Sequence, residues 1–298
     1  MTWKVSLPCT RDEAELAEAE AELFADIEPM PVLVTSEETA ERWQLDAFFE
    51  RKPDRAAIDR LLALAPSAGG RRPRPEQVPE HDWVTLSQQG LEPVHAGRFF
   101  VHTPAFRGAV PAGAVPFRIE AGLAFGTGQH ETTAGCLVAL DRLKRQGFRA
   151  RNFADVGTGT GLLAFAALHL WPMARGVASD IDPIAVAVTR ENAGINRVPL
   201  GRGTGRLDTV TAAGLEHPRL DRQAPYDLVI ANILAGPLVE LAPSIGPAVA
   251  PGGRLILAGL LESQAARVAA AYQREGLRML FSVWRGEWPT LVLRRPRA

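Results

Sequence analysis

The stretch from Asn152 to Ala167 constrains the fold of this chain more than any other. It predicts a buried strand, a turn with glycines at positions 157, 159 and 161, and an apolar helix. Glycine adopts positive φ readily, and it lets a ligand approach the backbone because it has no Cβ atom. The first N–H groups of the helix have no partner inside the helix, so they can hold polar ligand atoms. The sequence therefore predicts a strand, loop and helix that bind a nucleotide-like ligand.

The glycine spacing alone is compatible with two kinds of nucleotide. Gly159, Gly161 and Ala164 fit the Gly-x-Gly-x-x-Ala fingerprint of dinucleotide-binding folds. Asp155 lies ahead of the first glycine, and the resulting Asp-x-Gly-x-Gly-x-Gly pattern resembles the nucleoside-binding loop of S-adenosylmethionine-dependent methyltransferases. Other segments must decide between the two.

The next predicted strand, residues 176–179, leads to Asp180. A carboxylate at this place can accept hydrogen bonds from both hydroxyls of a ribose, as in dinucleotide folds. A helix-capping role for Asp180 is the weaker interpretation, because Asp182 already caps the helix that begins at Pro183. We therefore expect Asp180 to bind a nucleoside.

A strongly predicted buried strand, residues 226–231, delivers Asn232 to the carboxyl edge of the sheet, where open α/β sheets bind their ligands. Asn232 lies where amino-group methyltransferases carry an Asn-Pro-Pro-type element. Its amide oxygen and a neighbouring backbone carbonyl can accept hydrogen bonds from an incoming amine and aim the amine lone pair at a methyl group. The alternative interpretation is that Asn232 only caps the next helix.

The C-terminal segment helps to separate the two nucleotide hypotheses. Residues 251–253, Pro-Gly-Gly, predict a turn into a strand at 254–258, and a helix is expected from Ser263. Residues 277–284 and 290–293 can then form an antiparallel pair. An antiparallel C-terminal hairpin on a parallel sheet favours a methyltransferase over a dinucleotide dehydrogenase.

A second unusual loop, residues 125–133, precedes a helix predicted at 134–146. Its His130 and Glu131 have three interpretations: metal ligands, an acid–base pair, or part of a pocket wall. The lack of a His-Glu-x-x-His pattern argues against a metal. The two threonines that follow either cap the helix or offer a hydroxyl to a ligand.

The N-terminal part of the chain predicts a small α/β unit. Residues 3–8 alternate like a strand, and Thr10 to Glu13 form a capping-box pattern that opens a helix. Two more strands and a second helix are expected, at residues 32–34, 43–49 and 54–65. This order is typical of a ferredoxin-like domain.

The length of the chain and one segment rich in proline and glycine indicate two domains joined by a linker. A chain of 298 residues is long enough for two domains. Proline, glycine and arginine interrupt residues 66–93, which indicates a semi-rigid linker. We expect a first domain at residues 1–75, a linker at 76–105 and a second domain at 106–298.

The net charge of −1 argues against a dominant nucleic-acid footprint, but it conceals an uneven distribution. Residues 1–50 carry thirteen acidic and three basic side chains, a local charge of −10. A solvated helix face is the plainer interpretation, and a docking surface for a basic protein is the functional one.

No uncharged apolar run approaches the ~20 residues of a membrane span. Two distant cysteines, Cys9 and Cys136, fit a reduced compartment, so we expect the cytoplasm.

Taken together, these motifs resemble those of the PrmA family, which methylates large-subunit ribosomal protein eleven. The resemblance extends over residues 81–298, and residues 1–75 agree in length and layout. It is carried by the segments Phe125 to Thr133, Asp155 to Gly161, Asp180 to Pro183, Ala231 to Leu238, Gly259 to Leu261 and Glu287-Trp288.

The resemblance implies a seven-stranded Rossmann-like S-adenosylmethionine-dependent methyltransferase domain, preceded by a small ferredoxin-like α+β domain that grips the substrate. Thr133, Gly157, Asp180 and Asn232 fall on the family's cofactor-binding positions, and Gly159 belongs to the same glycine loop. Asn232 is also the candidate catalytic residue. No metal is expected.

The implied activity is N-methylation of lysine side chains and of the N-terminal amine of ribosomal protein eleven, free or in the ribosome. A monomer without direct contact to nucleic acid or membrane is expected. The alternatives are a methyltransferase for another lysine protein or for RNA, a nicotinamide-dependent dehydrogenase, and a non-catalytic nucleotide-binding ribosome factor. The charge balance speaks against RNA as the methylated substrate.

Overall fold

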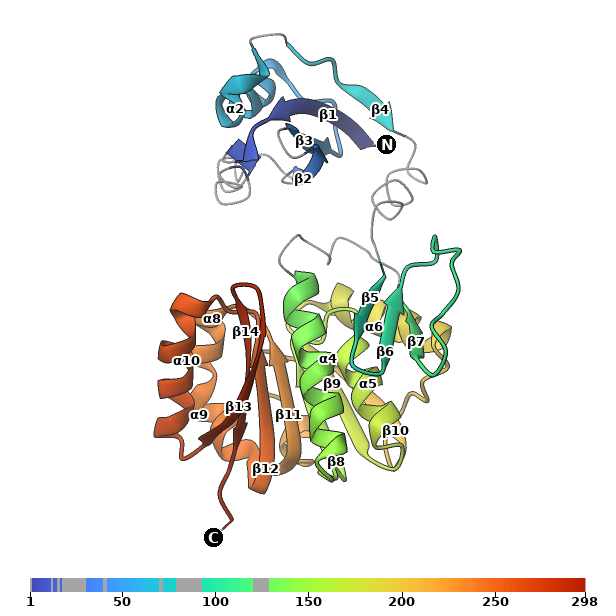
Figure 1. Ribbon diagram of the computed structural model, residues 1–298, viewed down its shortest axis with the longest axis vertical. Coiled ribbons are helices and arrows are strands. Elements are labelled where there is room, and N and C mark those ends of the chain that lie inside the picture. Colours follow the sequence, from blue (N-terminus) through green and yellow to red (C-terminus); the bar gives the residue numbers. More distant parts are fainter. Residues whose placement is uncertain are drawn as a thin grey trace. The chain divides into compact units, whose positions relative to one another are not determined.

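The chain forms two compact units, Met1–Gly90 and Leu91–Ala298. They are seen in a computed structural model (Figure 1). The residues that the structure describes are 2–11, 13, 14, 17, 31–39, 42–69, 72–78, 93–119 and 129–297.

An antiparallel sheet of four strands, in the order β2-β3-β1-β4, forms the first unit. The strands are β1 (Thr2–Cys9), β2 (Val32–Thr39), β3 (Arg42–Phe49) and β4 (Glu76–Val78). Alternate residues of the two central strands, such as Val5, Leu7 and Leu45, share one core with helix α2 (Arg55–Leu64). A short 3-10 helix, Pro66–Ala68, follows. The period-two pattern of β1 thus places its apolar residues on the side of the sheet that α2 covers.

The predicted capping box is confirmed. The N–H of Thr10 donates to the Glu13 carboxylate at 2.8 Å, and the N–H of Glu13 donates to the Thr10 hydroxyl at 3.3 Å. Most of the helix predicted after it lies outside the described residues. The segment predicted as a linker, 76–105, contains β4 of the first unit at one end and two strands of the second unit at the other.

A large sheet of seven strands, in the order β10-β9-β8-β11-β12-β14-β13, organises the second unit. Its strands are β8 (Asn152–Val156), β9 (Arg175–Asp180), β10 (Arg206–Thr211), β11 (Tyr226–Asn232), β12 (Val249–Ala258), β13 (Arg278–Arg285) and β14 (Trp288–Arg294). The first five are mutually parallel, and β14 is antiparallel to both β12 and β13, which confirms the predicted C-terminal hairpin.

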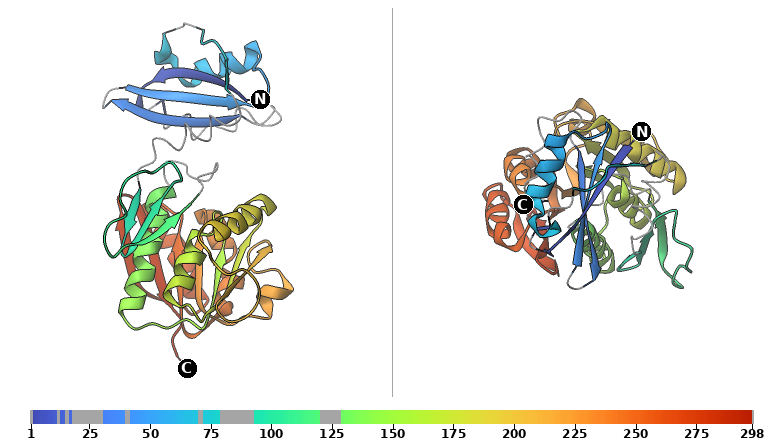
Figure 2. Two further views of the ribbon diagram at one scale, coloured as in Figure 1. Left: turned by 90° about the vertical axis from the view of Figure 1, so that its right-hand side faces the viewer. Right: turned by 90° about the horizontal axis from the view of Figure 1, so that it is seen from above.

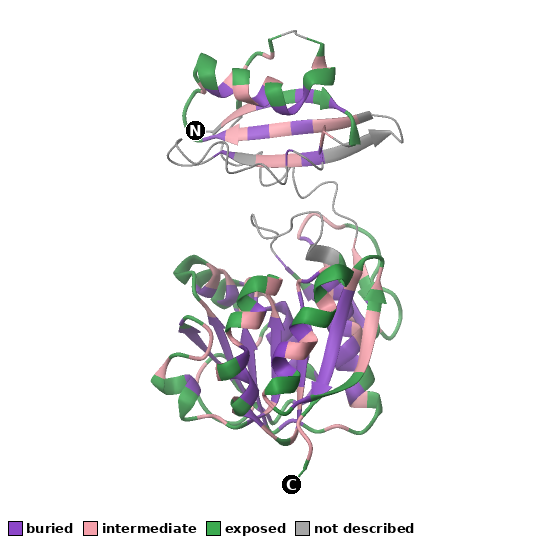
Figure 3. Ribbon diagram, turned by 90° about the vertical axis from the view of Figure 1, so that its left-hand side faces the viewer, coloured by how far each residue is buried: buried purple, intermediate pink, exposed green. Residues whose placement is uncertain are grey.

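Helices cover both faces of this sheet, whose strands are largely buried (Figure 3). The helices are α4 (Gln129–Arg145), α5 (Leu162–Leu170), α6 (Pro183–Ile195), α7 (Pro218–Asp221), α8 (Ala235–Glu240), α9 (Ala242–Ala248) and α10 (Glu262–Arg274). Helices α4 and α5 share one core with the sheet, and α8, α9 and α10 share a second core on the opposite face.

The structure corrects two sequence expectations for this unit. Helix α4 begins five residues earlier than residue 134, and the Pro-Gly-Gly run at 251–253 lies inside β12, where Gly252 has a φ of 79° beside an irregular register with β11.

A small sheet of three strands, β5 (Val94–Ala96), β6 (Phe99–His102) and β7 (Val115–Arg118), lies beside α4 (Figure 2). Asp141 of α4 ties this sheet to the helix, because its buried carboxylate receives the Nε of Arg98 at 2.6 Å and also pairs with Arg145. Gly97 has a φ of 60°, and a Cβ atom there would lie 2.9 Å from the Asp141 carboxylate. The small sheet therefore depends on one buried acid and one glycine.

The Asp141→Ala variant should lower the free energy of unfolding by about 1–3 kcal/mol, because Arg98 would lose a charge-assisted hydrogen bond to a buried partner. Urea denaturation of the full chain measures this. Asp59→Ala is the matched control, since the Asp59 and Arg72 side chains of that ion pair are about half exposed and such pairs contribute about 0–1 kcal/mol. Equal losses in the two variants would contradict the anchoring role of Asp141.

Candidate active site

The order of the strands places the site. From β8 the chain runs to β9 and β10 on one side, and then returns to β11 and β12 on the other. The carboxyl ends of β8, β9 and β11 therefore meet at the point where the order reverses, which is where open α/β sheets bind ligands. Ala231 of β11 pairs with Val156 of β8, so Asn232 comes level with the start of the glycine loop.

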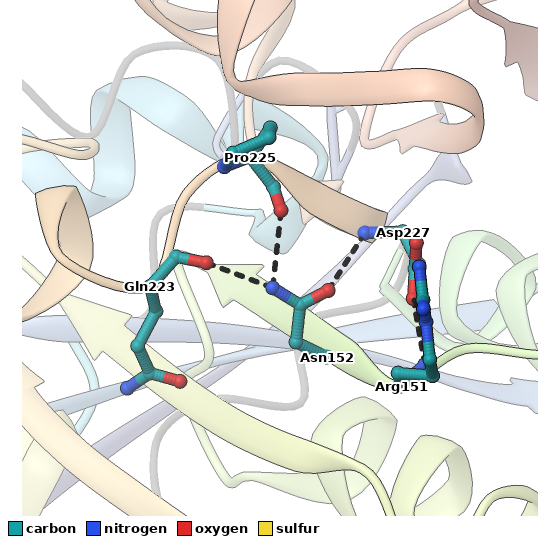
Figure 4. Close-up of polar contacts among 5 residues, drawn as sticks. All are labelled: Arg151, Asn152, Gln223, Pro225 and Asp227. Carbon is teal, nitrogen blue, oxygen red and sulfur yellow. Dashed lines mark hydrogen bonds and ion pairs between the residues drawn. The ribbon is translucent and has the colours of Figure 1, made fainter.

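Asn152 sets this register at the opposite end of the two strands (Figure 4). Its Nδ2 donates to the carbonyl oxygens of Gln223 and Pro225, and its Oδ1 accepts the N–H of Asp227. Asp227 in turn accepts the N–H of Arg151 at 2.8 Å. A one-residue slip would break all of these bonds, so the amino ends fix how the carboxyl ends are aligned.

The glycine loop turns tightly over β9. The N–H groups of Gly157 and Thr158 both donate to the Ser179 carbonyl, at 2.8 and 3.0 Å. Gly157, Gly159 and Gly161 have φ values of 71°, 54° and 86°. A Cβ atom on Gly157 would lie 2.1 Å from Cγ2 of Ile233, whereas one on Gly159 would meet nothing within 4 Å. The loop is thus packed on one side, and it is open at Gly159.

Asp155 lies buried beneath the loop. Its Oδ2 accepts the Thr158 hydroxyl at 2.7 Å and the N–H of Ala164 at 3.1 Å, which tethers the loop to the first turn of α5. Its Oδ1 has no hydrogen-bond partner among the described residues. Burial raises the pKa of Asp155 to about 7, and the two hydrogen bonds oppose that rise. The buried carboxyl is therefore protonated more easily than an exposed aspartate.

Asp180 ends β9 against the same loop, as predicted. Its Oδ2 accepts the N–H of Gly159 at 2.9 Å, and its Oδ1 accepts the N–H of Asp182 at 3.1 Å. Asp182 caps α6 by accepting the N–H of Ile184, which confirms the predicted cap. Each carboxylate oxygen has a second lone pair, so Asp180 can still accept hydrogen bonds from a ligand.

Helix α6 contributes two loop contacts that the sequence did not reveal. The Thr189 hydroxyl donates to the Gly159 carbonyl at 2.8 Å, and Asn192 Nδ2 donates to the Thr160 carbonyl at 3.1 Å. Both side chains are fully buried. The only signal in the sequence was a pair of polar residues three apart on an otherwise apolar helix face, which is a weak one.

Thr133 and Asn232 meet at the edge of the site. Asn232 Nδ2 donates to the Thr133 hydroxyl at 3.3 Å, which leaves the amide oxygen of Asn232 available to another donor. Both capping interpretations are wrong. Helix α4 begins at Gln129, so Thr132 and Thr133 lie within it, and Leu234, not Asn232, is the N-cap of α8.

Large apolar side chains are exposed along the same edge. Ile181 follows Asp180, Ile184 lies in the first turn of α6, and Leu234 follows the β11 strand; each is at least 70% exposed. Exposed large apolar side chains that lie close together often mark a surface for a ligand or partner. The contacts described above bring the five predicted site residues to this same edge.

The second predicted loop is described only from Gln129 onward. The Glu131 carboxylate lies 3.1 Å from Nε of Arg285 at the end of β13. Among the described residues, no group of three or more His, Cys, Asp or Glu side chains is placed to hold a metal. Likewise, none of the described helices has the length and apolar character of a membrane span.

The raised pKa of Asp155 predicts a pH-dependent stability. The unfolded carboxyl titrates near 3.8 and the folded one near 7, so the folded state binds the extra proton between those values and loses stability as the pH rises through them. Asp155→Asn, which cannot ionise, should therefore gain melting temperature relative to the wild type between pH 5 and 8. Asp221→Asn on the exposed surface is the control. A difference that stays constant or shrinks with rising pH would contradict the prediction.

Comparison with known proteins identifies the family of the chain. The sequence profile of the family described as "Ribosomal protein L11 methyltransferase (PrmA)" matches residues 9–296. A ribosomal protein L11 methyltransferase of Caulobacter sp. (strain K31) is 42% identical over 291 residues, which are 94% of this chain and 96% of that protein. One from Chelativorans sp. (strain BNC1) is 46% identical over 220 residues, covering 74% and 73% of the two chains.

A solved structure extends the similarity to the fold. The ribosomal protein L11 methylase of Lactobacillus delbrueckii subsp. bulgaricus superposes with a TM-score of 0.57 at 25% identity, over 70% of this chain and 99% of that one. The family profile spans both units and nearly the whole sequence. The chain belongs to the ribosomal protein L11 methyltransferase family.

Proposed function

We propose that this protein transfers a methyl group from S-adenosylmethionine to amines of ribosomal protein L11, namely lysine side chains and the N-terminal amine. The observation that carries the proposal is the meeting of Asn232 with the glycine loop at the switch point of the sheet. Family membership supplies the reaction class, and the names of the relatives supply the substrate.

The residues fit the proposed cofactor. Gly159 leaves open space for a ligand against the backbone, and Asp180 can accept the ribose hydroxyls while it holds the loop. The exposed Ile181 is suited to pack on a base next to that ribose. S-adenosylmethionine supplies an electrophilic methyl group on a sulfonium when bound. The part of the protein is to hold the donor and to bring an amine in line with it.

Asn232 is the residue that we propose aligns the amine. The Thr133 hydroxyl accepts a hydrogen bond from its Nδ2, which leaves the Asn232 Oδ1 available as an acceptor. An N–H of the incoming amine donates to that oxygen, and the nitrogen lone pair is then directed to the opposite side.

The amine must be neutral before it can attack. A lysine ammonium has an unperturbed pKa of about 10.4, so it must lose a proton first. That proton can leave to water, or the pKa of the ammonium group can fall when binding of the substrate removes it from solvent.

The first unit is proposed to be a ferredoxin-like domain that binds the protein substrate. Its described strand order, β2-β3-β1-β4 with antiparallel neighbours, supports that fold. The local charge of −10 in residues 1–50 suits a basic ribosomal protein. We further propose that the enzyme is a cytoplasmic monomer.

The Asp180→Ala variant should bind S-adenosylmethionine about 10- to 100-fold more weakly, because hydrogen bonds to charged groups contribute about 1.5–3 kcal/mol. Isothermal titration measures the affinity, and thermal shift should show stabilisation of the wild type by the cofactor and by its demethylated product but not by NAD. Asp182→Ala, which alters only the cap of α6, should keep most of the affinity. Stabilisation by NAD alone would refute the proposed cofactor.

The Asn232→Ala variant should lose on the order of 100-fold in kcat, since the amine would no longer be aligned, while the melting temperature changes little. Transfer of labelled methyl groups to purified ribosomal protein L11 measures turnover. Asn196→Ala is the matched control, because its amide bonds to the Arg118 backbone away from the site. Unchanged turnover in the Asn232 variant would remove this residue from the mechanism.

A further inference from the structure

Arginines lie opposite one another at the amino edge of the large sheet. Arg254 of β12 pairs with Arg294 of β14, and Arg294 pairs with Arg278 of β13. On the other half of the sheet, Arg206 of β10 pairs with Arg175 of β9 in the same way. Like charges directly opposite on neighbouring strands destabilise a sheet. Arg175 and Arg206 alternate with Gly176 and Leu207 of the α4 side, so they point to the other face, and the three arginines of β12, β13 and β14 form a group of their own.

The three arginines of β12, β13 and β14 share a face with the end of α4. Ile256 and Val292 belong to the α4 core, and Arg254 and Arg294 lie two residues from them, so they point to the same side of the sheet. The Arg254 guanidinium lies 5.1 Å from the Phe148 ring just beyond α4.

Arg142 of α4 completes the group, because its guanidinium lies 3.9 Å from the Phe281 ring of β13. Helix α4 packs along β12, β13 and β14 in Figure 1. We name this group the arginine face. It consists of Arg142, Arg254, Arg278 and Arg294 together with the rings of Phe148 and Phe281.

The arginine face is not neutralised by its own elements. Its four elements carry only two acidic residues, Glu131 and Asp141. Glu131 pairs with Arg285, and Asp141 is buried between Arg98 and Arg145.

The four cations themselves form no ion pair within the described part of the chain. Arg142, Arg278 and Arg294 are exposed to solvent. Burial lowers the pKa of Arg254, and the charges of Arg294 and Arg297 lower it further. The face therefore carries a positive potential that is open to an external anion.

The chemistry of the face favours a nucleic acid over other anionic partners. Residues 91–298 hold 23 basic and 16 acidic side chains, a net charge of +7, and all but one of the cations are arginines. Arginine binds phosphate with two parallel hydrogen bonds, and its planar group stacks on aromatic rings and bases. The half-exposed rings of Phe148 and Phe281 lie among these guanidinium groups. Cations interleaved with aromatic rings are the composition of a surface that binds a single strand or a hairpin loop.

We propose that the arginine face binds the phosphate backbone of RNA, while the carboxyl edge of the same sheet holds the cofactor and the amine. The net charge of the whole chain argues against binding of nucleic acid. The placement of the arginines on one face leads us to expect that this face binds RNA. The proposal extends the proposed function, because a ribosomal protein is encountered beside RNA. Along β12, Arg254 lies four residues from Ala258, the partner of Asn232, a separation of about 13 Å. RNA on the face would thus lie near the site without occupying it.

The test is fluorescence anisotropy of a fluorescein-labelled RNA hairpin with the full chain at several salt concentrations. The double variant Arg278→Gln with Arg294→Gln should bind at least about tenfold more weakly, and the slope of log K against log salt should fall by about 1.4 to 1.8, the value for two lost phosphate contacts. The matched control is Arg202→Gln with Arg267→Gln, which removes the same charge from exposed positions elsewhere. It should retain the wild-type affinity and slope.

Three results would overturn the proposal: no binding of RNA by the wild type, equal weakening in both double variants, or binding of phosphatidylglycerol vesicles without binding of RNA. Melting curves with and without S-adenosylmethionine establish that the variants are folded. Methylation of free ribosomal protein L11 is measured in parallel, and the Arg278 and Arg294 variant should retain it. If the wild type transfers methyl groups but does not bind RNA, only the proposal for the arginine face is wrong. If it binds RNA but does not transfer methyl groups, only the proposed function is wrong.

Discussion

The parallel pairing of β8 with β11 is the constraint on which the site depends. Because β8 also pairs with β9, one strand aligns the glycine loop with Asp180 on one side and with Asn232 on the other. The register is held at the far end by the Asn152 side chain, which bonds to the backbone around Asp227. The functional edge is therefore positioned by polar contacts at the edge where no chemistry is proposed.

The second unit distributes its charge along the strand direction. Asp155, Asp180 and the amide oxygen of Asn232 lie at the carboxyl edge of the sheet. Arginines that lie opposite one another on neighbouring strands occupy the amino edge. Hydrogen bonds from backbone amides stabilise the acids of the first edge. The arginines of the second edge lie opposite one another on neighbouring strands, where like charges repel.

Local patterns predicted most of the elements that carry the site. The apolar run before Gly157, the cap at Asp182 and the C-terminal hairpin were all identified correctly, because each depends on residues close in the chain. The prediction failed where packing outweighed local preference. Pro-Gly-Gly at 251–253 resembles a turn, but it lies within strand β12. The strand accommodates it because Gly252 has a positive φ and the register with β11 is irregular there. Helix α4 likewise begins before the two threonines for which capping was one of two interpretations.

The sequence by itself determined the kind of ligand loop, the candidate residues Asp180 and Asn232, and the family, because these reside in contiguous motifs whose spacing reflects backbone geometry. Only the tertiary structure decided which side chains act together. Thr133 and Asn232 are far apart in the chain, as are Asp141 and Arg98, and Arg254 and Arg294. Their meeting depends on strand order and register, which are set by the packing of the whole sheet and not by any local pattern.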